Sequence, residues 1–131
     1  MKTILVDAVH ALVVKQGDSY GVFGEMHKLL EAFPNRKVIV TNADDEGMKK
    51  YGLDRVPYEV FTLRHDPEKT DPRYYKMMLA QLGLEAGDAV YFEHSLEAVK
   101  SAESVGIATY HYDSEKRDLE GLKNFLVKSL H

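Results

Sequence analysis

The fold is decided by the stretch Lys2-Thr3-Ile4-Leu5-Val6-Asp7-Ala8-Val9-His10-Ala11-Leu12-Val13-Val14. Four apolar or β-branched residues run directly into Asp7, a pattern typical of a buried parallel strand that ends in a carboxylate. Open α/β sheets carry their functional residues at the carboxyl ends of the strands. We therefore take Asp7 as the reference point and ask which other polar residues reach the same edge.

The composition is that of one globular domain. Of the 131 residues, 44% are hydrophobic and 29% are charged, so the chain can close a core without disulfides or a structural metal. It contains no cysteine, which removes thiolate nucleophiles and Cys-type zinc sites and fits a reducing, cytoplasmic compartment.

Charge and hydropathy argue against two classes of partner. The net charge of -4 is spread over interspersed acidic and basic residues, so we expect no nucleic-acid partner. The sequence has no signal-peptide pattern and no apolar run near the roughly 20 residues that a bilayer span needs, so we expect no membrane association.

Apolar runs alternate with helical patterns along the rest of the chain. After a polar loop or small hairpin at 15–21, strands are predicted at 37–42, 58–63, 88–94 and 107–112. Helices are predicted over 22–33, from an Asn42 N-cap to Tyr51, from an Asp71 N-cap to Leu82, from a Ser95 cap to about Val105, and over 119–130. This alternation predicts a single α/β domain over 1–131, a three-layer, Rossmann-like fold with a mostly parallel five-stranded sheet.

Four stretches place polar residues at the expected edge of this sheet. They are Asp7 after the first strand, Val38-Ile39-Val40-Thr41-Asn42, Glu68-Lys69-Thr70-Asp71-Pro72, and Asp88-Ala89-Val90-Tyr91-Phe92-Glu93-His94-Ser95 with the helix that follows it as far as Gly106. Together, in this order and spacing, they resemble the motifs of the haloacid dehalogenase (HAD) superfamily of phosphohydrolases.

The resemblance implies a role for each polar residue. Asp7 would be a nucleophile that forms an aspartyl-phosphate, and Thr41, Asn42 and Lys69 would hold the phosphoryl oxygens. Asp7 and Glu93 would bind Mg²⁺. The resemblance also implies that the first strand is central, between the strands that carry Thr41 and Glu93.

The sequence departs from the family pattern in two places. Where the first motif has a second aspartate, used as general acid/base, this chain has Val9, followed by His10 and Ala11 in place of glycine and threonine. A positioned acid/base contributes roughly 10²–10⁴-fold to rate. In the last motif, Glu93-His94 stands where an acidic pair is expected, which disturbs a magnesium site that prefers oxygen ligands.

These departures favour a binding or scaffold module with a degenerate, weakly active or inactive site. The alternative is a Mg²⁺-dependent phosphohydrolase that acts through Asp7. Neither usual insertion point, between Asp7 and Thr41 or between Thr41 and Lys69, has room for a cap domain, so we expect a capless chain. An uncovered site further suggests a homodimer or a protein partner.

Each candidate residue also has a structural interpretation. Asp7 could cap the next helix or pair with Lys69, and Thr41 could bond to the backbone of its own turn. A mixed set of Asp7, His10, Glu93 and His94 would suit a transition metal better than magnesium, provided that the chain bends after Glu93. The tyrosines at 74, 75, 110 and 112 are expected to be half-buried, with their hydroxyls in water.

Overall fold

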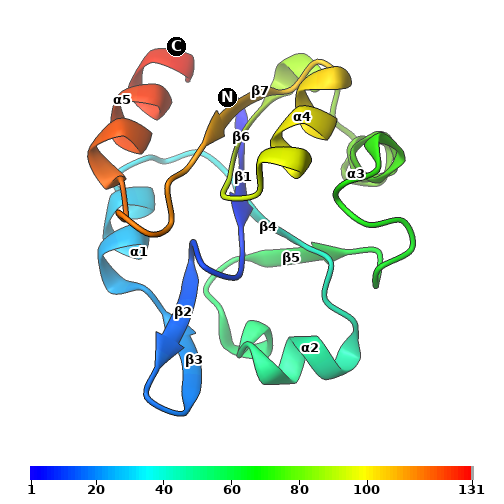
Figure 1. The fold of residues 1–131 in the computed structure, drawn as a ribbon. Coiled ribbons are helices and arrows are strands. Elements are labelled where there is room, and N and C mark those ends of the chain that lie inside the picture. The colour runs from blue at the N-terminus through cyan, green and yellow to red at the C-terminus, as the bar shows by residue number, and fades with distance from the viewer. Residues whose placement is uncertain (131) are drawn as a thin grey trace.

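The computed structural model describes residues 1–130, and its elements follow the predicted alternation (Figure 1). Within this range they are β1 (Thr3–Asp7), β2 (Val13–Gln16), β3 (Ser19–Val22), α1 (Gly24–Glu31), β4 (Lys37–Thr41), α2 (Asp45–Lys50), the 3-10 turn η1 (Leu53–Arg55), β5 (Glu59–Thr62), α3 (Pro72–Leu82), the 3-10 turn η2 (Ala86–Asp88), β6 (Ala89–Glu93), α4 (Leu96–Ser104), β7 (Ala108–His111) and α5 (Leu119–Ser129). No helix among these is long and apolar enough to cross a bilayer.

The main sheet has five strands in the order β5-β4-β1-β6-β7, and each neighbouring pair is parallel. The central position of β1, between the strands that end in Thr41 and Glu93, is confirmed. All five residues of β1 are buried, as are all five of β6. Parallel strands covered on both faces read as continuous apolar runs, which is why these two strands were recognisable from sequence.

Helices cover both faces of the sheet, so the predicted three-layer α/β fold is confirmed (Figure 1). Because side chains alternate along a strand, Ile4 and Val6 pack with α1 and α5, whereas Leu5 packs with α3 on the other face. Two separate cores result, divided by the sheet. The faces of the central strands β1 and β6 are fully used for packing, which leaves the ends of these strands for functional polar residues.

A two-stranded hairpin and a short helix lie at the carboxyl ends of the strands (Figure 1). The hairpin, β2–β3, turns at Gly17, whose φ of 69° is a conformation that glycine adopts without penalty. Its Tyr20 packs edge-to-face on Tyr51, which follows α2, with 4.8 Å between ring centroids. The polar segment at 15–21 is therefore part of a hairpin, one of the two options predicted.

Three local predictions are wrong. Val22 lies in β3 rather than in the first helix, which begins at Gly24. Asp44, not Asn42, caps α2, because its side chain accepts a hydrogen bond from the Gly47 amide. Tyr74, Tyr75 and Tyr112 are almost fully buried instead of half-buried. The two α3 tyrosines point into the core on one face of the sheet, and Tyr112 packs on Phe92 in the core on the other face.

Leu5 and Leu96 allow a matched test of the central strand. Leu5 is fully buried in β1, whereas Leu96, the first residue of α4, is 49% exposed. We expect Leu5→Ala to lower the free energy of unfolding by about 2–5 kcal/mol. The same change at Leu96 should alter it by less than about 0.5 kcal/mol. Urea unfolding followed by circular dichroism measures both, and equal losses would contradict a buried central β1.

Candidate active site

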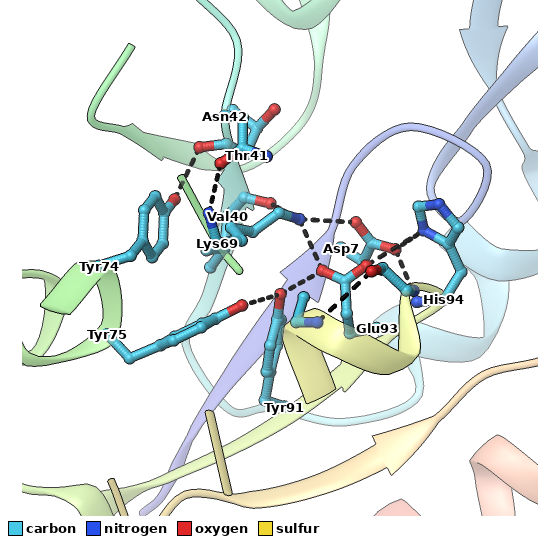
Figure 2. A network of polar contacts seen from close by, with 12 residues as sticks. Asp7, Val40, Thr41, Asn42, Lys69, Tyr74, Tyr75, Tyr91, Glu93 and His94 are labelled. Atoms are coloured by element: carbon cyan, nitrogen blue, oxygen red, sulfur yellow. Dashed lines mark hydrogen bonds and ion pairs between the residues drawn. The ribbon is translucent and has the colours of Figure 1, made fainter. Parts of the chain in front are cut away.

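The topology brings three strand tips to one place. Asp7 ends β1, Thr41 ends the neighbouring β4, and Glu93 ends β6 on the other side of β1. Lys69 reaches the same edge from the loop between β5 and α3, as Figure 2 shows. The structure thus confirms the prediction that these four residues meet at one edge of the sheet. Asp7, Lys69 and Glu93 are nevertheless buried, with exposed fractions of 1%, 7% and 0%.

Lys69 is the centre of the site. Its Nζ atom lies 3.0 Å from Asp7 Oδ1 and 2.6 Å from Glu93 Oε1, and it donates a third hydrogen bond, of 3.2 Å, to the Val40 carbonyl. A lysine ammonium has three protons, so all its donors are used. The Lys69 backbone amide is in turn held by Asn42 Oδ1 at 2.8 Å. Asn42 therefore anchors the loop that delivers Lys69.

Burial and ion pairing oppose each other in this cluster. Burial alone would lower the pKa of Lys69, but Asp7 and then Glu93 outweigh it and raise that pKa well above its usual range. Burial alone would raise the pKa of Glu93, but the Lys69 charge and the hydrogen bonds from His94, Lys69 and Tyr91 hold it well below its usual range. For Asp7, burial and then the Glu93 carboxylate raise the pKa, against the opposing effect of Lys69 and His94.

His94 closes the other side of the carboxylate pair. Its ring Nδ1 lies 2.5 Å from Asp7 Oδ2 and 3.2 Å from Glu93 Oε2, and its backbone amide donates to Asp7 Oδ2 at 3.0 Å. β6 ends at Glu93 and the chain bends at His94, which allows both side chains to lie beside Asp7. Hydrogen bonds to Asp7 and then Glu93 raise the pKa of His94 to about 10.

A chain of buried tyrosines supports Glu93 from the core. Tyr91 donates its hydroxyl proton to Glu93 Oε1, and the Tyr75 hydroxyl lies 3.1 Å from that of Tyr91 (Figure 2). Tyr74 donates to the Thr41 carbonyl at 2.7 Å. Sequence reasoning named Tyr74 and Tyr75 only as half-buried residues and assigned no role in the site to them or to Tyr91. Two signals could have found them: Tyr91 and Glu93 alternate on one face of β6, and Tyr74 and Tyr75 begin the buried face of α3.

Above the cluster is an open cavity of about 520 Å³. Val9, His10, Lys50, Tyr51 and His65 contribute to its wall, together with the strand tips. The Thr41 hydroxyl accepts a hydrogen bond of 3.2 Å from the Ala43 amide, which is the turn-bonding role that the sequence allowed. The cavity can hold a small organic molecule, and Asp7 lies in its wall beside an apolar neighbour, Val9.

The donor set as arranged does not fit Mg²⁺. Asp7, Glu93 and His94 offer ligand atoms within 4.8 Å of one another, but one of the three is an imidazole nitrogen and the oxygens already accept hydrogen bonds. Mg²⁺ requires near-octahedral oxygen ligands. His10 lies outside this group of three, although its ring packs edge-on against that of His94 at 5.2 Å. The structure thus brings together three of the four residues of the predicted transition-metal site. Metal binding there stays a prediction.

Family models and curated protein sequences contain no match to this chain. Several solved structures do match it. D,D-heptose 1,7-bisphosphate phosphatase from B. bronchiseptica, complexed with magnesium and phosphate, superposes with a TM-score of 0.73 at 15% identity, over 98% of this chain and 99% of that one. The chain has the HAD fold. A HAD family enzyme from Bacteroides thetaiotaomicron, with magnesium and inorganic phosphate, gives 0.67 at 12% identity over 87% and 95%. An uncharacterised protein from Corynebacterium glutamicum gives 0.65 at 16% over 97% and 96%.

Removing the buried ammonium should destabilise the protein strongly. Lys69→Met leaves two buried carboxylates without their shared partner, and breaking a buried ion pair in this way costs about 3–5 kcal/mol. Lys76→Met, on the exposed face of α3, is the matched control and should change stability by less than about 0.5 kcal/mol. Chemical denaturation of both variants at neutral pH measures this. Similar stabilities for the two would show that the cluster contributes little.

The raised pKa of His94 makes stability depend on pH. A histidine in an unfolded chain has a pKa of about 6.5, whereas the pKa of His94 in the folded chain is raised to about 10. Its stabilising contribution, on the order of 2–4 kcal/mol, is therefore complete below the unfolded pKa and is lost as pH rises toward the folded one. Urea unfolding of wild type between about pH 7 and pH 9 should show this decline. His94→Gln should lack it, and parallel pH profiles would refute the assignment.

Proposed function

We propose that this chain is a HAD-fold binding module whose site has weak or no phosphatase activity. The observation that carries the proposal is that Val9 stands beside Asp7 in the wall of the cavity, while both oxygens of Asp7 already bind protein N–H groups. The proposal includes the absence of a cap: the segments after β1 and β4 form the hairpin, α2, η1 and β5.

Phosphate-ester hydrolysis through Asp7 would make three demands on the site. A carboxylate oxygen must be free to attack phosphorus, a proton must reach the leaving oxygen, and positive charge must balance the transferring group. Asp7 Oδ1 is bound to Lys69 and Asp7 Oδ2 to His94. Val9 cannot supply a proton. Loss of a positioned acid alone costs roughly 10²–10⁴-fold in rate, or about 3–5 kcal/mol of barrier.

The cavity itself supports binding. It is open, its wall mixes aromatic and cationic groups such as Tyr51 and Lys50, and the cluster beneath it is rigidly paired. A site of this kind can orient a small organic ligand without transforming it. Binding without turnover is therefore the function that this arrangement favours.

A Mg²⁺-dependent phosphatase is the second candidate, and one observation favours it. The imidazole of His10 lies next to His94 in the cavity wall and could move a proton in place of the missing acid. Two of the superposed HAD-fold structures hold magnesium and phosphate. In this alternative Asp7 attacks, and Thr41 and Lys69 hold the phosphoryl oxygens. His94 must first leave the carboxylate pair, and Lys69 must release one of its three present acceptors.

Turnover of p-nitrophenyl phosphate with Mg²⁺ separates the two candidates. We expect wild type to release p-nitrophenol no faster than Asp7→Asn, because the reaction then does not pass through Asp7. A wild-type rate at least about 100-fold above that of Asp7→Asn would overturn the proposal and establish the phosphatase. The double variant Val9→Asp/His94→Asp serves as a positive control, since a gain of Asp7-dependent activity would show that Asp7 is correctly oriented.

A further inference from the structure

The two carboxylates of the site lie between two basic side chains. Lys69 Nζ contacts one oxygen of each, Asp7 Oδ1 and Glu93 Oε1, at 3.0 and 2.6 Å. His94 Nδ1 contacts the other oxygen of each, Asp7 Oδ2 and Glu93 Oε2, at 2.5 and 3.2 Å. Figure 2 shows the ring of His94 facing both groups from the side opposite Lys69. The pair is thus contacted from both sides by side chains of the protein.

The oxygens on the His94 side have no lone pair left for another ligand. Asp7 Oδ2 faces two nitrogens, the His94 amide at 3.0 Å and the His94 ring. Glu93 Oε2 likewise faces two, the Ser95 amide at 3.0 Å and the His94 ring. A carboxylate oxygen accepts about two hydrogen bonds. Removal of the imidazole alone would free one acceptor position on each oxygen, side by side.

We propose that the imidazole ring of His94 is a tethered group that takes the place of a divalent metal ion between Asp7 and Glu93. It bridges the two carboxylates as a metal ion would, and it excludes one by occupying both acceptor positions. The site is therefore complete without a metal. This inference rests on the proposed function and extends it, because it assigns a reason why this site would not take up magnesium.

The surroundings hold the ring in this position. The His94 backbone is fixed by its own amide bond to Asp7 and by His111, whose Nε2 lies 3.0 Å from the His94 carbonyl oxygen. The ring packs against His10 on one edge and keeps 29% of its side-chain surface exposed. A ring anchored in this way contacts both carboxylates without a change in the backbone.

Binding of Mn²⁺, followed by electron paramagnetic resonance at neutral pH, tests the proposal without any need for activity. We expect wild type to bind Mn²⁺ at least roughly tenfold more weakly than His94→Ala and His94→Asp, a change of the size seen when groups beside a metal site are altered. Mg²⁺ should compete for the site in both variants. His27→Ala, which removes an imidazole that packs on Tyr58, is the matched control and should behave as wild type.

Two results would overturn the proposal. Wild type that binds Mn²⁺ as tightly as the variants would show that His94 excludes nothing, and absence of binding in all proteins would show that exclusion does not depend on His94. Zn²⁺ is titrated in parallel, because tighter binding by wild type than by His94→Ala would make His94 a metal ligand instead. A failed turnover assay leaves these outcomes unchanged, so the two proposals fail separately.

A second measurement needs no variant and therefore does not depend on how the variants fold. The ring ¹⁵N signals of His94 in the wild-type protein report whether Nδ1 keeps its proton. We expect them to be unchanged by Mg²⁺ and by a chelator. A shift of these signals on addition of Mg²⁺ would show that the metal ion displaces the ring, which contradicts the proposal.

Discussion

The ion pairs of Lys69 with Asp7 and Glu93 are the constraint on which the rest of the site depends. They join residues from three separate parts of the chain: the tips of two strands and the loop before α3. Burying three charges is favourable only if each finds partners, and here every donor of Lys69 and every carboxylate oxygen has one. The position of the α3 loop, the end of β6 and the ring of His94 all follow from satisfying this cluster.

The sheet is the frame that makes such a cluster possible. Parallel strands bring their carboxyl ends to a common edge, and right-handed crossovers put the helices on the two faces. Polar residues at the tips then meet without disturbing either apolar core. The same fold is found in structures that hold magnesium and phosphate.

Sequence reasoning predicted the scaffold well because its signals are local and strong. Apolar runs such as Ile4–Val6 and Val38–Val40, with polar residues after them, define buried parallel strands. It also named Asp7, Lys69, Glu93 and His94. It could not predict how they pair, because Lys69 contacts Asp7 across 62 positions of sequence and periodicity carries no information about such contacts. Asn42 illustrates the limit: a residue suited to capping a helix instead holds the Lys69 loop.

The hydroxyl chain of Tyr75 and Tyr91 makes the site visible to ultraviolet absorption. The protein has eight tyrosines and no tryptophan, so tyrosine dominates its near-ultraviolet spectrum. Burial raises the pKa of Tyr75 and of Tyr91 well above that of an exposed phenol, and the neighbouring Glu93 carboxylate adds to the shift. These two phenols should ionise only when the core opens, whereas an exposed phenol ionises at about pH 10. Burial also raises the pKa of Tyr58, Tyr74, Tyr110 and Tyr112. Tyrosinate absorbance that appears only in strong alkali thus records the opening of the core as a whole, of which the support of Glu93 is one part.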